Sequence, residues 1–304
     1  GRDASSMLKA ADMAMYHAKS AKKGYEFYEP HLESANLERL EMENELRNAI
    51  ARHELVVYYQ PQEDLATGQI SGMEALIRWQ HPQRGLVSPA AFIELAEETG
   101  LIGDIGHWVL CTICAQLNDW IDRGFEAPRV AINLSPRQLT NPNLVATFRE
   151  VIMDARLSPD RIEFEITESA IMSRPEEMIE MLRELKAMGS RLAIDDFGTG
   201  YSSLNYLKRF PLDYIKIDRT FISDVMSNRI DADIVRTIIA LAQALEVKVI
   251  AEGVETPMQR QFLKDQKCHY AQGFLLSKPV PAPEIERKFL KRTNNANLVH
   301  FPKQ

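Results

Sequence analysis

Nine polar residues that could do chemistry stand at or near the carboxyl ends of short apolar runs. They are Glu74, Asn133, Glu165, Asp195, Asp196, Lys216, Asp218, Glu252 and Gln272. If these runs meet in space, the carboxylates repel one another unless protons or cations neutralise them. Carboxylate and amide oxygens without His or Cys favour Mg²⁺, Mn²⁺ or Ca²⁺ over zinc. The adjacent Asp195 and Asp196 could serve two ions, as a two-metal hydrolytic site requires.

The runs that carry these residues alternate with helical segments, which predicts an α/β fold, a TIM-like (β/α)8 barrel. Strands are expected at Leu55–Gln60, Ile70–Trp79, Val130–Leu134, Ile162–Thr167, Leu192–Asp196, Tyr214–Asp218, Val247–Ala251 and, more weakly, Tyr270–Phe274. Helices are expected at Pro89–Glu98, Asp104–Arg123, Glu176–Met188, Ala232–Leu245 and Pro257–Lys264. The first two strands are joined by too few residues for a parallel crossover. We therefore expect a barrel with an antiparallel first strand.

Strand alternation predicts that the acidic side chains point into this barrel. Glu163 and Glu165 share one face of their strand, and the apolar residues between them share the other. The same alternation turns Lys216 and Asp218 inward. A carboxylate at a strand end often only caps the following helix, and this alternative stays open for Asp218 and Glu168.

The composition is that of an ordinary globular protein, with 45% hydrophobic and 26% charged residues in 304. A net charge of −7 argues against binding to nucleic-acid polymers, because that function needs a basic face. No apolar run reaches the roughly 18–20 residues of a membrane span. Three cysteines are too few for a disulfide framework. We expect a cytoplasmic protein without membrane contact.

The candidate residues belong to seven short motifs that follow one another in order. The motifs are Glu74-Ala75-Leu76 with Arg78-Trp79, Asn133-Leu-Ser135, Glu165-Ile-Thr-Glu168, Asp195-Asp196-Phe-Gly-Thr-Gly, Lys216-Ile-Asp218, Glu252-Gly-Val-Glu255 and Gln272-Gly-Phe274. With them, the chain closely resembles the EAL family of cyclic di-GMP phosphodiesterases. The resemblance implies a barrel with a reversed first strand, and hydrolysis of cyclic di-GMP to linear pGpG with Mg²⁺ or Mn²⁺, two ions per site.

The resemblance also implies a role for each motif residue. Glu74, Lys216 and Glu252 are expected to be catalytic, with Lys216 holding or helping to deprotonate the attacking water and Glu252 as the other candidate base. The expected metal ligands are Glu74, Asn133, Glu165, Asp195, Asp196 and Glu252. The expected substrate contacts are Gln60, Arg78, Asp218, Glu255, Gln272 and Pro279. Glu168 is expected to anchor the loop that follows Asp196.

The segments outside the barrel suggest a longer protein. Residues 1–30 resemble the end of a GGDEF diguanylate cyclase domain, without its signature loop. Residues 31–53 have amphipathic spacing and are expected to form a linker or signal helix, or a helix that packs on the barrel. The barrel is expected at 54–290 and an irregular tail at 291–304. The resemblance thus implies a fragment of a tandem GGDEF–EAL protein that forms a homodimer, with upstream regions that could anchor the full protein to the inner membrane.

Two other functions stay open. The first is a non-catalytic module that senses cyclic di-GMP, although such sensors typically lose metal ligands and the full set is present here. The second is a different metal-dependent barrel enzyme that acts on a sugar phosphate or a carbonyl compound. That function accounts for the acids but not for the ordered motifs.

Overall fold

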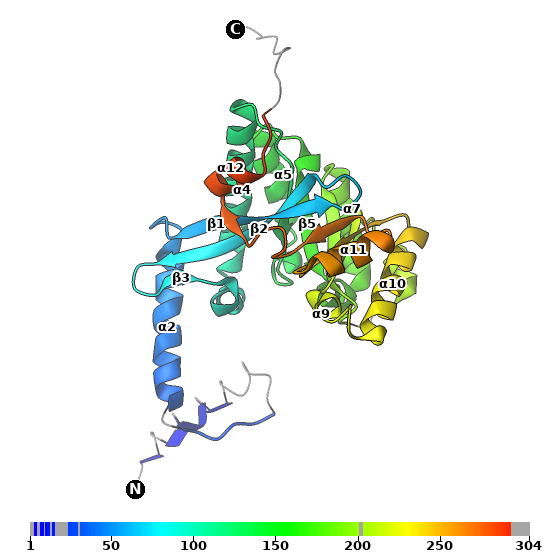
Figure 1. The fold of residues 1–304 in the computed structure, drawn as a ribbon. Helices are drawn as coiled ribbons and strands as arrows, with labels where there is room; N and C mark the ends of the chain where they lie inside the picture. Colours follow the sequence, from blue (N-terminus) through cyan, green and yellow to red (C-terminus); the bar gives the residue numbers. More distant parts are fainter. Residues whose placement is uncertain are drawn as a thin grey trace, which may run out of the picture.

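A closed barrel of strands forms the centre of the computed structural model (Figure 1), which describes residues 31–200 and 203–292, residues 24–29 and scattered positions between 3 and 15. The barrel strands are β1 (Leu55–Asp64), β2 (Ile70–His81), β4 (Arg129–Asn133), β5 (Ile162–Thr167), β6 (Arg191–Phe197), β7 (Tyr214–Ile217), β8 (Lys248–Ala251) and β9 (Tyr270–Gln272). They pair in the order β1-β9-β8-β7-β6-β5-β4-β2, and pairing of β1 with β2 closes the ring. The expected strands are confirmed.

Strand β1 is the reversed strand of the barrel. It runs antiparallel to both β2 and β9. The other neighbouring strands of the barrel, in the order β2, β4, β5, β6, β7, β8 and β9, pair in parallel. Leu55, the first residue of β1, therefore pairs with Trp79 near the carboxyl end of β2. The hairpin predicted from the short connection is confirmed, and two short strands that were not expected, β3 (Gly85–Val87) and β10 (Val280–Pro281), extend it.

Helices cover the outside of the barrel. They are α3 (Ile93–Thr99), α4 (Ile102–Asp122), α5 (Leu144–Asp154), α6 (Glu168–Ser173), α7 (Pro175–Ala187), α8 (Leu204–Leu207), α9 (Arg219–Ser223), α10 (Arg229–Ala244), α11 (Pro257–Asp265) and α12 (Ala282–Lys288), with 3-10 turns at Pro89–Ala91, Gln138–Thr140 and Pro159–Arg161. The five expected helices are present with shifted ends. Sequence reasoning missed α5, α6, α8, α9 and α12.

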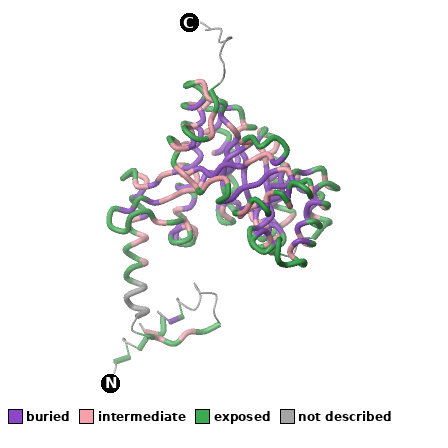
Figure 2. Tube along the Cα trace, viewed as in Figure 1, coloured by how far each residue is buried: buried purple, intermediate pink, exposed green. Residues whose placement is uncertain are grey.

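The main apolar core lies between the strands and the helices, as the buried segments in Figure 2 show. Phe164 on the outward face of β5 stacks on Phe148 of α5 with ring centroids 5.3 Å apart. Both rings are buried, together with Ile166 on the same face of β5. Because the apolar side chains of β5 face the helices, its polar ones must face the interior of the barrel.

Helix α2 (His31–Ala49) contacts the rest of the fold from its middle to its carboxyl end, where Arg39 pairs with Glu98 of α3, and its first turns extend away from the barrel (Figure 1). Leu46 and Ala49 are buried, while Leu37 is 58% exposed. Glu45 of α2 contacts the buried His81 at the end of β2, with 2.9 Å between Oε2 and Nε2. The helix predicted from His31 is present, and it is attached to the strand that carries Glu74.

No helix among the described residues is long and apolar enough to cross a membrane. Half of the expected cyclase remnant at 1–30, and all of the expected tail after Arg292, lie outside the described residues.

Candidate active site

The buried ammonium of Lys216 lies at the centre of the acidic cluster. Its Nζ is 2.7 Å from Glu165 Oε2, 2.8 Å from Glu252 Oε1, 3.2 Å from Asp195 Oδ1 and 3.7 Å from Glu74 Oε2. These groups come from β2, β5, β6, β7 and the residue after β8. The strand ends therefore bring together five residues that are far apart in sequence, as the parity argument predicts.

Lys216 is positively charged in this arrangement. Burial alone would lower its pKa, but Asp195, Glu165, Glu252 and Glu74 raise it well above its usual value. An ammonium that holds its proton this firmly compensates the acids and can place a partner by hydrogen bonding, but it is a poor proton acceptor.

The pKa values of the surrounding acids are raised as well, which favours their protonated, uncharged forms. Burial raises the pKa of Glu165 well above its usual value. Burial, with the charges of Asp195 and Glu74, raises the pKa of Glu252 to about 8 even though Lys216 opposes the change. The pKa of Asp196 is raised to about 6 by burial and by the neighbouring Asp195. One ammonium is thus insufficient to keep all of the carboxylates ionised.

Several oxygens in the cluster are placed to bind a cation. One oxygen from each of Asp195, Asp196 and Glu252 lies within 4.8 Å of the others. Glu165 Oε1 is buried without any hydrogen-bond partner. The exposed Asn133 donates from Nδ2 to Glu74 Oε1 at 2.7 Å, which turns its own oxygen away from that carboxylate. The donor set is therefore suited to a hard divalent cation.

Two neighbouring aspartates reach the same site because β6 is distorted there. Adjacent residues of a regular strand point to opposite faces. Asp196 instead has a positive φ of 54°, and the pairing of β6 with β7 shifts register between Ile194 and Phe197. The backbone N–H of Asp196 donates to Asp195 Oδ1 at 2.9 Å. The distortion thus brings both carboxylates to the barrel mouth.

Glu168 holds the loop that follows these aspartates. Its side chain is buried at the start of α6, and Oε2 accepts hydrogen bonds from the backbone N–H groups of Gly198 at 2.8 Å and Gly200 at 3.4 Å. Gly198 has a φ of +101°, which favours glycine. This arrangement is the one expected of a loop anchor; Tyr201 and Ser202 of the motif lie outside the described residues.

The expected substrate contacts fall into two groups. Half-buried Arg78, half-buried Pro279 and exposed Glu255 lie at least partly open to solvent. Gln60 and Gln272 are instead buried and hydrogen-bonded together, with 3.0 Å between Gln272 Nε2 and Gln60 Oε1. The structure therefore places this pair inside the barrel wall.

Asp218 shows the helix cap that the sequence left open. Its Oδ1 accepts from the backbone N–H of Thr220 at 2.9 Å and so caps α9. It also lies close enough to Asp196 to raise the pKa of that residue. A cap and a position at the mouth are compatible, because a carboxylate has two oxygens.

Sequence reasoning missed two interior residues, Gln62 and Arg129, because it ended the first strand at Gln60 and began the third at Val130. Arg129 Nε donates to Glu163 Oε2 at 2.6 Å, and its Nη2 donates to Gln62 Oε1 at 3.0 Å. An arginine at the start of an apolar strand, two residues before another inward position, is the signal that could have found it.

Two known bacterial proteins are similar in sequence to most of this chain. The chain is 45% identical over 276 residues, 90% of its length, to a protein of Pseudomonas aeruginosa named bifunctional diguanylate cyclase/cyclic di-GMP phosphodiesterase MucR, and spans 40% of it. It is 38% identical over 296 residues, 96% of its length, to the Escherichia coli cyclic di-GMP phosphodiesterase PdeR, and spans 44% of it. The chain thus spans less than half of these relatives.

A solved structure agrees with the barrel. The structure described as the PaMucR phosphodiesterase in complex with c-di-GMP superimposes with a TM-score of 0.78 at 44% identity, covering 81% of this chain and 99% of that one. The EAL domain family matches residues 43–279, which include the cluster around Lys216 and its loop anchor. The chain belongs to the EAL domain family.

Proposed function

We propose that this protein hydrolyses one phosphodiester bond of cyclic di-GMP and releases linear pGpG. The observation that carries the proposal is the convergence of Glu74, Glu165, Asp195 and Glu252 on the buried Lys216. Similar relatives are named cyclic di-GMP phosphodiesterases, and a similar structure is described as a complex with that nucleotide. A cluster of acids binds a dianionic substrate only if cations lie between them.

The proposed cations are two Mg²⁺ or Mn²⁺ ions. The proposed ligands are Glu74, Asn133, Glu165, Asp195, Asp196 and Glu252. The unpartnered oxygen of Glu165 and the cluster of Asp195, Asp196 and Glu252 support this assignment. When bound, such ions lower the pKa of water and neutralise phosphate charge.

The protein's own groups have separate proposed tasks. Lys216, held charged by four acids, orients the attacking water and stabilises negative charge that develops on the phosphate. Glu252 is the other proposed base, and burial with the neighbouring acids raises its pKa to about 8 in the absence of a cation. Glu74, which lies on β2, is proposed to position the reacting groups. The same acids, Asp195 and Glu74, keep Lys216 charged and raise the pKa of Glu252.

The proposed substrate contacts are Arg78 and Gln60 near the phosphates, Asp218 at the mouth, and Glu255, Gln272 and Pro279 around the second guanylate. The partly open positions of Arg78, Glu255 and Pro279 support a direct contact. For the buried Gln60 and Gln272, the proposed contribution is to hold the wall of the substrate site.

The proposed organisation of the chain follows the resemblance. Residues 1–30 are proposed to be the end of a GGDEF domain, 31–53 a signal helix, 54–290 the catalytic barrel and 291–304 a tail. The protein is proposed to work as a homodimer in the cytoplasm. Size-exclusion chromatography with light scattering tests the dimer directly.

The test of the function is incubation of the purified chain with cyclic di-GMP and Mg²⁺, Mn²⁺ or excess EDTA, followed by chromatography of the nucleotides. We expect pGpG with either metal and none with EDTA. Asp195→Asn should abolish turnover, and Asp231→Asn, at a half-buried position in the first turn of α10 outside the cluster, is the matched control. Tight cyclic di-GMP binding without product in any metal would instead favour the sensor function.

A further inference from the structure

A row of four residues crosses the barrel wall one layer below the acidic cluster. In the strand register, Gln272 of β9 pairs with Gln62 of β1, Gln62 pairs with Gly72 of β2, and Gly72 pairs with Arg129 of β4. Gln62, Arg129 and Gln272 are all buried. Glu74 follows two residues after Gly72 on the same face of β2, so it lies one layer closer to the mouth.

These side chains form a continuous hydrogen-bonded relay to Glu74. Arg129 Nη2 donates to Gln62 Oε1 at 3.0 Å, and Gln62 Nε2 donates to Gln272 Oε1 at 2.9 Å. Gln272 Nε2 then donates to Glu74 Oε2 at 2.5 Å. The same nitrogen also donates to Gln60 Oε1 at 3.0 Å.

The two ends of the relay determine the direction of every bond in it. A guanidinium can only donate hydrogen bonds, and an ionised carboxylate can only accept them. Gln62 must therefore turn its oxygen toward Arg129, and Gln272 must turn its nitrogen toward Glu74. The same orientation of the two amides therefore follows from the Arg129 end and from the Glu74 end of the relay.

Gly72 leaves the space that the relay needs. A Cβ at this position would lie 2.8 Å from Arg129 Cζ, 2.8 Å from Gln62 Oε1 and 2.9 Å from Arg129 Nη1. Its backbone does not have the positive φ that would itself require glycine. Space for the contact between Arg129 and Gln62 is therefore the reason for a glycine here.

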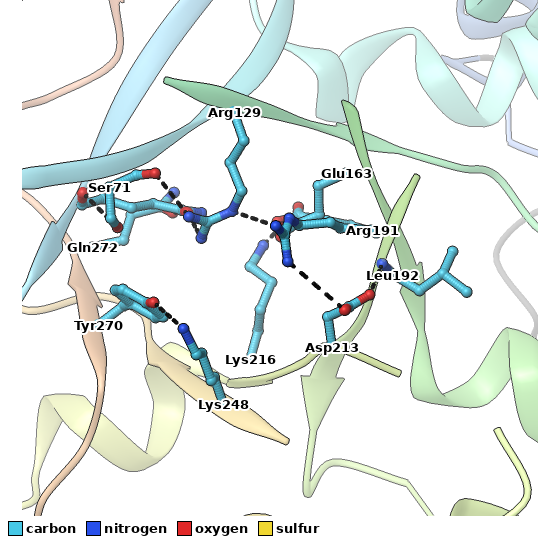
Figure 3. Close-up of polar contacts among 12 residues, drawn as sticks. Ser71, Arg129, Glu163, Arg191, Leu192, Asp213, Lys216, Lys248, Tyr270 and Gln272 are labelled. Carbon is cyan, nitrogen blue, oxygen red and sulfur yellow. Dashed lines mark hydrogen bonds and ion pairs between the residues drawn. The ribbon is translucent and has the colours of Figure 1, made fainter. Parts of the chain in front are cut away.

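Arg129 is itself held firmly in place. Its Nη1 donates to the backbone oxygen of Ser71 at 2.8 Å and its Nε donates to Glu163 Oε2 at 2.6 Å, as Figure 3 shows. Its guanidinium also lies over the rings of Tyr214, at 4.5 Å, and Tyr270, at 5.2 Å. Because these contacts fix the guanidinium, its hydrogen bond to Gln62 holds the Gln62 amide in one orientation.

We propose that Arg129 and Gln62 are positioning residues that act through Gln272 to orient the Glu74 carboxylate for binding a divalent cation. The inference rests on the proposed metal-dependent function of the same site. Groups that hydrogen-bond a ligating carboxylate typically contribute 10- to 100-fold in metal affinity. The relay places such support in the barrel interior, one layer below the acidic cluster.

The test is Mn²⁺ binding, measured from the electron paramagnetic resonance signal of free Mn²⁺, in variants that break the relay in two ways. Gln62→Met removes one link at similar size, and Gly72→Ala keeps every hydrogen-bonding group but displaces the contact between Arg129 and Gln62. We expect each to weaken Mn²⁺ binding by about tenfold. At saturating Mn²⁺, we expect the KM for cyclic di-GMP to be unchanged and most turnover to return.

Two controls separate positioning from a general loss of stability. Gly103→Ala adds a methyl group in α4 where nothing lies within 4 Å. Val235→Ala removes buried volume from α10, far from the relay. Neither control should change the Mn²⁺ affinity.

Two results would overturn the proposal. One is wild-type Mn²⁺ affinity in a folded Gln62→Met or Gly72→Ala protein, and the other is equal weakening in Val235→Ala. A wild-type protein that binds Mn²⁺ but releases no pGpG would contradict the proposed function alone, because the affinity comparison does not depend on turnover.

Discussion

Replacing Lys216 by methionine removes the only positive charge within 4.0 Å of the four described carboxylates of the cluster. Two of these carboxylates are Glu165, which is fully buried, and Asp195, which is nearly so. Removing one partner of a buried ion pair costs about 3–5 kcal/mol, because the remaining charge is left uncompensated. We therefore expect the free energy of unfolding of Lys216→Met to fall by about that amount at pH 8 in EDTA.

A divalent cation should restore much of this loss, because it occupies the same set of oxygens. Ligand at 100 times its dissociation constant stabilises a folded protein by about 2.7 kcal/mol. The variant should gain more stability from Mg²⁺ than the wild type does, since its site no longer contains a competing ammonium. The loss should also shrink at low pH, where the acids are protonated.

The assay is urea unfolding followed by circular dichroism, in EDTA and in saturating Mg²⁺. Lys248→Met is the matched control, since Lys248 is exposed on the neighbouring strand β8 and contacts Tyr270. A Lys216→Met protein as stable as the wild type in EDTA at pH 8, or one that gains no more from Mg²⁺ than the wild type, would refute the reasoning.

Three further predictions concern the site and its attachments. In EDTA, the free energy of unfolding of the wild type should fall as the pH rises from 4.5 to about 8, because folded Glu252 keeps a proton that the unfolded chain has released. Urea unfolding of Glu252→Gln should show a smaller fall over the same pH range. Glu168→Ala leaves two loop N–H groups without their acceptor, so their hydrogen exchange should quicken and turnover should fall; unchanged exchange would exclude the anchor role. Glu45→Ala should cost about 1 kcal/mol by loss of the bond to His81, measured by thermal unfolding, whereas Glu43→Ala, which removes only an exposed contact within α2, should cost less.

The fold and the acidic cluster could be predicted because both follow from local alternation. Glu163 and Glu165 alternate with apolar residues, and the structure buries both inside the barrel. The reversed first strand followed from the length of one connection. Helix α5 was missed because it follows a loop rich in asparagine and proline, and its burial depends on Phe164, a partner distant in sequence.

The partners of the interior residues could not be predicted in the same way. Which acid Arg129 pairs with depends on the register between β4 and its neighbours, and alternation gives only the face. Gln272 is a motif residue, yet its contact with Glu74 depends on Gln62 and on the pairing of β9 with β1. Contacts across strands are three-dimensional properties that a one-dimensional pattern does not contain.

The direction of β1 also determines where the chain enters and leaves the barrel. Leu55 begins β1 beside Trp79, so α2 arrives at the rim that holds the acidic cluster around Lys216. At the other end, Arg292 pairs with Phe125, just before the amino end of β4, on the opposite side of the barrel. In Figure 1, α2 extends below the barrel and α12 lies above it. A module fused ahead of α2 would therefore stand beside the proposed nucleotide entrance, whereas one fused after α12 would start from the opposite side of the barrel.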